Sequence, residues 1–266
     1  MPAMGKSWAI AVIFALAGFG LSTWLSRLSD FAVHLDLDTS DVGVVLVFQE
    51  FFGLMAMQAL SWFITRKSHV RYTLYSSLFF GLAVCMPGLA LGFPSLCMAV
   101  AIFGTGYGAL DISMNSRADS IEKHYHTRVI GNCHAFFRLG GLAGALLSAG
   151  LIEISAPLWQ HFLLAGLLIA TTALFVWKRL PPVPLQNRQT RFRLSLPNRT
   201  LMPLCLVAVC VTIVEGGMAD WAGLYVRQEL GADARTAALC YALFSAGMFL
   251  GRLGSERVIG RLGAPR

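Results

Sequence analysis

The segment KRLPPVPLQNRQTRFRLSLPN, residues 178–198, is the longest polar stretch of the chain. Four of its residues are prolines, which lack the backbone N–H that a helix interior needs. Long apolar blocks lie on both sides of the segment. We therefore predict a linker at residues 178–200, between a first helical bundle at residues 1–177 and a second at residues 201–266.

The composition is that of a protein whose solvent is lipid. Hydrophobic residues make up 56% of the chain and charged residues 13%, against about 25% charged residues in a soluble domain. A helix needs roughly 20 mostly apolar residues to cross a bilayer, because lipid cannot satisfy free backbone groups. The sequence therefore predicts an all-α membrane protein with a complete six-helix bundle before the linker and two helices after it. The eight predicted spans are residues 8–25, 42–64, 72–91, 95–114, 133–152, 158–177, 201–224 and 237–253.

The positive charges predict the orientation of these helices. Of 21 Lys and Arg residues, only Arg27, Arg227 and Arg235 fall in the connections on one side of the membrane. Cytoplasmic connections carry the excess of Lys and Arg, so we expect a cytoplasmic N-terminus and a cytoplasmic linker. The net charge of +7 does not indicate a nucleic-acid partner, because the basic residues lie between apolar blocks rather than on one face.

The chain repeats a pattern after the linker. Trp24 and Arg27 end the first apolar block, and Trp221 and Arg227 end the seventh, each pair followed by a short acidic stretch. A six-helix unit that repeats about an axis normal to the membrane is typical of one large class of secondary transporters. The repeat therefore supports the division at the linker.

Three stretches carry a resemblance to a known family. GTGYGALDISMNSRADSIE (residues 104–122) resembles the fourth-span signature of the fucose-permease-like branch of the major facilitator superfamily. CHAFFRLGGLAG (133–144) and VEGGMADWAGLYVRQELG (214–231) are similar to the fifth and seventh spans of bacterial inner-membrane members. The resemblance implies the major-facilitator fold, a multi-pass location in the bacterial cytoplasmic (inner) membrane, and a chain truncated after its eighth span.

Acidic residues inside the predicted spans are candidates for substrate binding or proton coupling. A carboxylate in the bilayer costs several kcal/mol unless it is paired, protonated or facing water. Asp111 either fills such a role or pairs with an arginine at the cytoplasmic end of its span; the resemblance, which includes Asn115, implies the functional role. Glu215 precedes two glycines that can loosen its helix, and Asp220 lies further toward the outer face.

Three further residues have two interpretations each. Trp24 and Arg27 form either an interfacial pair that fixes the depth of the first helix or part of the transport site. His134 opens the fifth span, where it either relays protons or holds neighbouring helices together by hydrogen bonding.

The loops after the second and eighth spans are candidates for a cytoplasmic gate. The resemblance implies an Asp-containing basic loop after the second span, whereas here the loop has no acid. The corresponding loop after the eighth span carries a Glu where the family usually has an Asp. The gating candidates are Arg66, Lys67, Arg71, Arg252, Glu256, Arg257 and Arg261.

Together these features predict a secondary active transporter that moves a small polar solute, such as a sugar or organic acid, with coupling to protons. The alternative is a truncated or split fragment that has no transport activity alone and pairs with a separate C-terminal half or with itself. An intramembrane enzyme would need a nucleophile and base such as Ser113 and His134, but no catalytic motif surrounds them. We therefore predict no enzyme activity, no cofactor and no metal site; the expected partners are the solute and the lipid bilayer.

Overall fold

A computed structural model describes residues 4–64, 70–183, 198–199 and 201–262 of the chain. The regular elements in these ranges are helices, and eight of the segments are long and apolar enough to cross a membrane, which confirms the predicted all-α membrane fold. The α-helices are α1 Met4–Leu25, α2 Leu28–His34, α3 Thr39–Ile64, α4 Val70–Cys85, α5 Phe93–Tyr125, α6 Ile130–Glu153, α7 Leu158–Val176, α8 Met202–Gln228 and α9 Ala234–Leu262. Two short 3-10 helices, η1 Pro87–Leu89 and η2 Trp177–Arg179, follow α4 and α7.

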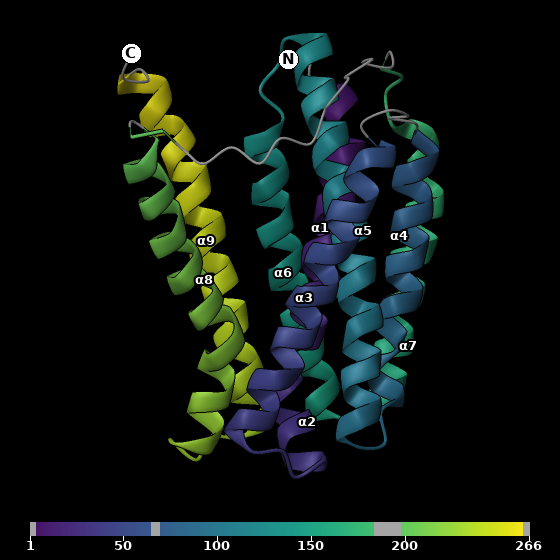
Figure 1. The fold of residues 1–266 in the computed structure, drawn as a ribbon, viewed down its shortest axis with the longest axis vertical. Coiled ribbons are helices and arrows are strands. Elements are labelled where there is room, and N and C mark those ends of the chain that lie inside the picture. Colours follow the sequence, from purple (N-terminus) through teal and green to yellow (C-terminus); the bar gives the residue numbers. More distant parts are fainter. Residues whose placement is uncertain (1–3, 65–69, 184–197, 200, 263–266) are drawn as a thin grey trace.

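The helices before the linker form one bundle, and α8 and α9 form a pair beside it (Figure 1). Within the bundle α3 packs along α5, α1 along α6, and α4 along both α5 and α7. The pair joins the bundle mainly through α9, which packs along α6, while α8 also contacts α2. The beginning of α1 and the end of α9 lie at the end of the molecule opposite α2, as an even number of spans requires (Figure 1).

Small residues allow the backbones of the bundle to approach closely. A Cβ atom added at Gly104 of α5 would collide with the carbonyl oxygen of Gln49 in α3, and one added at Gly140 of α6 would collide with that of Ala15 in α1. Such contacts matter in lipid, where helix association depends on close packing rather than on a hydrophobic effect. Gly247 of α9, in contrast, has open space around it and makes no close helix contact within the described residues.

Helix α5 is longer than the sequence predicts, running past residue 114 to Tyr125. The polar residues that ended the predicted span are stabilised by the beginning of the linker. Arg117 is buried and donates a hydrogen bond to the carbonyl oxygen of Pro181, and the Tyr125 hydroxyl donates to that of Pro182 at 3.2 Å. The linker therefore begins along the end of α5, and Asp111 lies within the helix rather than close to its end.

Helix ends are capped by residues that the sequence places nearby. The Glu122 carboxylate accepts hydrogen bonds from the backbone N–H groups of Val129 and Ile130, at 2.7 and 3.0 Å, at the beginning of α6. Gly231 adopts a φ of 67° in the turn between α8 and α9, a conformation that glycine takes without strain. Asp233 caps α9, and hydrogen bonds from the Thr236 hydroxyl and backbone N–H lower the pKa of its carboxyl.

Candidate functional site

The first group of polar residues within the membrane lies on α5. The Asn115 side-chain amide donates hydrogen bonds to the Asp111 carboxylate at 3.0 Å and to its backbone carbonyl at 2.9 Å. Tyr107 lies one turn earlier on the same helix. Asp111 is half-buried, and its hydrogen-bond partner among the described residues is a neutral amide rather than the arginine that one interpretation of the sequence required.

A second group joins the bundle to the α8–α9 pair and is called here the inner ionic cluster: Arg138, Glu215 and Arg252. The Arg138 guanidinium contacts the Glu215 carboxylate at 2.7 Å, and the Arg252 guanidinium lies 3.9 Å from the same carboxylate. Arg138 also lies over the Phe244 ring of α9, at 5.4 Å from its centroid. One carboxylate on α8 thus holds cations from α6 and α9 together.

His134 lies one turn before Arg138 on α6. Its ring packs edge-on against Phe14 of α1, with 5.3 Å between the ring centroids. This contact is aromatic rather than the predicted hydrogen bond, and the proton-relay role of His134 stays a prediction. Ser113, the nucleophile of the enzyme alternative, instead donates its hydroxyl hydrogen to Thr73 of α4 at 3.3 Å.

Glu50 is an acidic residue that the sequence interpretation missed. It lies on an exposed face in the middle part of α3, and its carboxylate accepts a hydrogen bond from Gln49 at 2.8 Å. Asp220, the acidic candidate on α8, is half-buried, unlike Glu50. The signal that identified Asp111, a carboxylate inside an apolar block, applied equally to Glu50.

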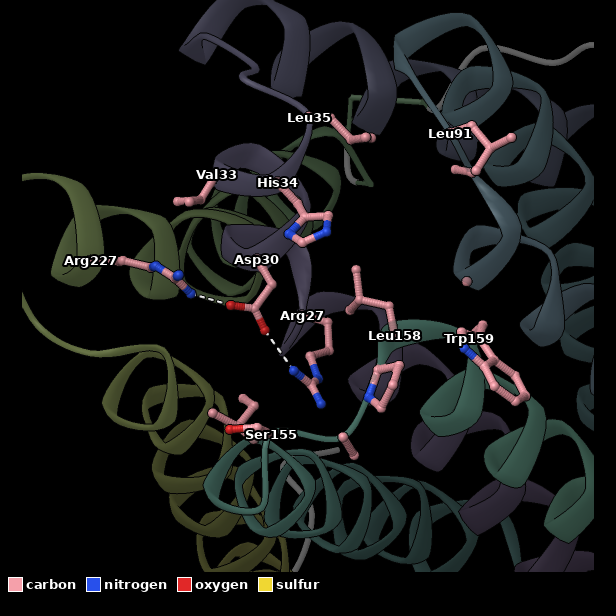
Figure 2. Close-up of a pocket in the computed structure, with 15 residues that line it drawn as sticks. Arg27, Asp30, Val33, His34, Leu35, Leu91, Ser155, Leu158, Trp159 and Arg227 are labelled. Atoms are coloured by element: carbon pink, nitrogen blue, oxygen red, sulfur yellow. Dashed lines mark hydrogen bonds and ion pairs between the residues drawn. The ribbon is translucent and has the colours of Figure 1, made fainter.

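A third group, called here the α2 ionic cluster, consists of Arg27, Asp30, His161 and Arg227. Asp30 binds Arg27 through one carboxylate oxygen at 2.8 Å and Arg227 of α8 through the other. The Arg27 Nε donates to Nδ1 of His161 in α7 at 3.1 Å, and the other imidazole nitrogen lies 3.4 Å from the Ser148 hydroxyl. This cluster is a second ionic contact between the bundle and α8 (Figure 2), at the α2 end of the molecule.

The interfacial interpretation of Trp24 and Arg27 is wrong. Trp24 has no exposed surface and packs against Phe31 and Phe103, with ring centroids 5.2 and 6.2 Å away. Arg27 is 5% exposed, so neither side chain reaches the lipid headgroups as an interfacial anchor would. A Trp–Arg pair at the end of an apolar block has the same sequence pattern whether its side chains face lipid or other helices, so the pattern could not distinguish the two.

The gating candidates are only partly within the described residues. Arg66 and Lys67 lie outside them, and Arg71 is exposed in the first turn of α4. Arg252 belongs to the inner ionic cluster instead of a loop, because α9 continues to Leu262. Glu256, Arg257 and Arg261 therefore lie on a helix, not in the predicted loop, and their side chains are outside the described part of the chain.

Charged groups inside the membrane can bind a polar solute or a proton, and a pair that joins two helices can break when they move. Asp111 and Asn115 offer acceptor and donor groups side by side on α5. The inner ionic cluster joins α8 to the bundle at Glu215, in the middle of the helix, and the α2 ionic cluster joins it at Arg227, in the last turn. Ion pairs therefore hold α8 to the bundle at two levels along its length.

Three bacterial membrane proteins have sequences similar to this chain. The uncharacterised transporter y4wD of Sinorhizobium fredii is 28% identical over 96% of this chain and 68% of its own length. An uncharacterised MFS-type transporter of Yersinia pestis is 26% identical over 98% of this chain and 68% of its own length. Membrane protein MosC of Rhizobium meliloti is also 26% identical, over 96% of this chain and 62% of its own length. The chain thus spans about two thirds of the length of these relatives.

Solved structures show the same fold. Two crystal structures of a bacterial homologue of the human lysosomal transporter Spinster, both inward-facing, superpose on this chain. The unoccupied form has a TM-score of 0.71 at 16% identity, over 99% of this chain and 64% of the homologue. The occupied form has a TM-score of 0.73 at 16% identity, over 97% of this chain and 61% of the homologue. Residues 8–266 match the Major Facilitator Superfamily, and the chain therefore belongs to that family of membrane transporters.

Proposed function

We propose that this protein is a secondary active transporter that moves a small polar solute, such as an organic acid or a sugar, together with protons. The observation that carries the proposal is the set of ionisable groups along α5, α6, α8 and α9: Asp111 beside Asn115, and Glu215 between Arg138 and Arg252. Ionisable residues in membrane helices are rare, and they mark substrate and ion pathways.

Asp111 is the proposed proton site. Its carboxylate is half-buried within a membrane helix, and a neutral amide is its hydrogen-bond partner among the described residues. A proton that binds there removes a charge from the membrane without leaving an unpaired cation behind. Asn115 keeps a donor at the site in both protonation states, so the site can hold a polar solute while the proton is carried.

Glu215 is proposed to couple binding to movement. Its pair with Arg138 joins α8 to α6 at 2.7 Å, and the two side chains are 28% and 13% exposed, so a solute can reach them. An anionic solute that binds Arg138, or a proton that binds Glu215, removes this connection and lets α8 move relative to the bundle. Two guanidiniums beside one carboxylate favour an organic acid over a sugar.

The test is proton movement by the purified 266-residue chain in liposomes that contain a pH-sensitive dye. Sugars and organic acids are added one at a time, and at least one is expected to cause proton entry. Asp111→Asn should abolish that entry while leaving counterflow of the solute. The matched control is Asp119→Asn, which changes an exposed carboxylate on the same helix that pairs with Lys123. Equal loss in both variants would contradict the role of Asp111.

The second candidate is a chain that does not transport alone. Leu224 is the buried residue of α8, whereas the first half of the helix, residues 202–214, is exposed throughout and carries large apolar side chains such as Leu204, Leu206 and Ile213. That surface favours assembly with a separate C-terminal half or a second copy. Absence of proton movement with every solute, restored when the missing partner is supplied, would favour this candidate.

A further inference from the structure

A cavity of about 600 Å³ lies at the α2 end of the molecule, away from the inner ionic cluster. It is lined by α2, the connection between α4 and α5, the connection between α6 and α7, and a single side chain of α8, Arg227 (Figure 2). This volume is within the range of sites that bind small molecules. The transport role proposed above does not use this cavity.

The polar lining has more hydrogen-bond donors than acceptors. Both oxygens of the Asp30 carboxylate are occupied, one by Arg27 and the other by Arg227. Arg27 donates a further bond to His161. The residue is only 5% exposed, and its Nη2 is buried without a hydrogen-bond partner among the described residues. Two guanidiniums therefore share one carboxylate, and one positive charge has no counterpart in the lining.

An unpaired buried donor of this kind costs free energy, more so when it belongs to a charged group. The cost is relieved by a ligand that brings an acceptor oxygen and a negative charge. A guanidinium binds carboxylate and phosphate oxygens through two parallel N–H groups, which suits an oxyanion better than a neutral acceptor.

Apart from His34 and Ser155, the rest of the lining is mainly apolar. Leu91, Leu158 and Trp159 line the side of the cavity opposite Arg227 (Figure 2), and Leu91 is 93% exposed at its rim. A ligand that lies between the two sides would place its charged end on the arginines and an apolar body against these three side chains. Inorganic anions would leave the apolar side uncovered.

We propose that this cavity binds an oxyanion carried on an apolar body, either a small organic carboxylate or the headgroup of an acidic phospholipid. The charged end binds Arg27 and Arg227, and the body lies against Leu158 and Trp159. Because the ligand competes with Asp30 for Arg227, its binding weakens the contact between α2 and α8.

The probe is cyclohexanecarboxylate, added to the purified 266-residue chain in a neutral detergent while tryptophan fluorescence is recorded. Cyclohexylmethanol and cyclohexylmethylamine have a similar body without the negative charge. We expect a saturable change with the carboxylate that the other two do not produce, and we expect Trp159→Phe to abolish it. Arg227→Gln should weaken binding by about tenfold or more, because a charge-assisted pair is lost.

Two further variants separate binding from folding. Arg235→Gln removes an arginine that forms an exposed pair with Glu153 and does not line the cavity, so it should leave binding unchanged. Leu91→Trp fills the rim without touching an ion pair and should also reduce binding. Binding of the alcohol or amine as strong as that of the carboxylate would overturn the proposal. Undiminished binding in Arg227→Gln and Leu91→Trp proteins that melt like the wild type would overturn it as well.

The two sources of the oxyanion are distinguished in lipid nanodiscs. If nanodiscs of phosphatidylglycerol prevent carboxylate binding and those of phosphatidylcholine do not, the headgroup is the ligand. If binding is equal in both, the ligand is a soluble carboxylate. Loss of binding in both lipids, with binding retained only in detergent, would contradict the proposal. None of these results depends on transport. The binding proposal can therefore fail while the proposed transport function stands, and the transport function can fail while the binding proposal stands.

Discussion

Removing one carboxylate at the α2 end should destabilise the whole protein. Asp30→Asn keeps the size of the side chain but takes away the charge that holds Arg27 and Arg227 together. Arg27 is 6% exposed at its side chain, Arg227 20% and Asp30 15%, so water screens this group poorly. Breaking a buried ion pair by removing one partner costs about 3–5 kcal/mol. Because Arg227 is partly exposed, we expect a loss of about 3 kcal/mol in the free energy of unfolding.

The measurement is the melting temperature of the purified chain in detergent, followed by tryptophan fluorescence. A loss of about 3 kcal/mol corresponds to a decrease of roughly 6–12 °C for a protein of this size. The matched control is Glu153→Gln, which removes a carboxylate whose pair with Arg235 is 57% and 54% exposed. Exposed pairs contribute about 0–1 kcal/mol, so the control should melt within about 4 °C of the wild type. Equal melting temperatures for the two variants would refute the assignment of Asp30 as a buried bridge between α2 and α8.

Three other predictions concern packing and assembly. Gly140→Ala should lower the free energy of unfolding, measured by chemical denaturation, by about 1–3 kcal/mol, because the added methyl collides with the Ala15 carbonyl. The control Gly247→Ala adds its methyl in open space and should be neutral or stabilise the protein by up to about 1 kcal/mol. Arg117→Ala should cost about 2 kcal/mol or more in the same measurement, since it leaves a cavity and removes the donor to the Pro181 carbonyl. Light scattering of the chain in detergent should show dimers or larger assemblies, because α3 carries an exposed carboxylate and α8 an uncovered face; a single monomeric species would contradict this expectation.

The number and type of helices could be predicted from the sequence, because the requirement is local. A span needs about 20 apolar residues wherever it lies in the fold, and the eight predicted spans correspond to the eight observed ones. The ends were less accurate. Helix α5 and helix α9 continue beyond the predicted ends, because polar residues such as Arg117 find partners that a local pattern does not contain.

The candidate site was predicted only in part. Asp111 and Asn115 are four residues apart on one helix, so helical periodicity alone brings them together. The pair of Glu215 with Arg138 joins α8 to α6, 77 residues apart, and no periodicity predicts it. The sequence could indicate that Glu215 needs a partner in the membrane, but the packing of α8 and α9 against the bundle selects which cation supplies it.

The sequence by itself determined that this protein lies in a membrane, and that its residues form eight apolar helices long enough to cross one. It also indicated which residues in those helices are too polar to face lipid. Only the tertiary structure decided which of these residues meet. Arg27 and His161 are separated by 134 residues and lie 3.1 Å apart. Trp24, which the sequence placed either at the lipid interface or in the transport site, is buried in the core. The physical reason is that burial and pairing depend on which faces of the helices pack together. Helix packing in lipid depends on the fit of backbone and small side chains along the whole contact, which no single segment encodes.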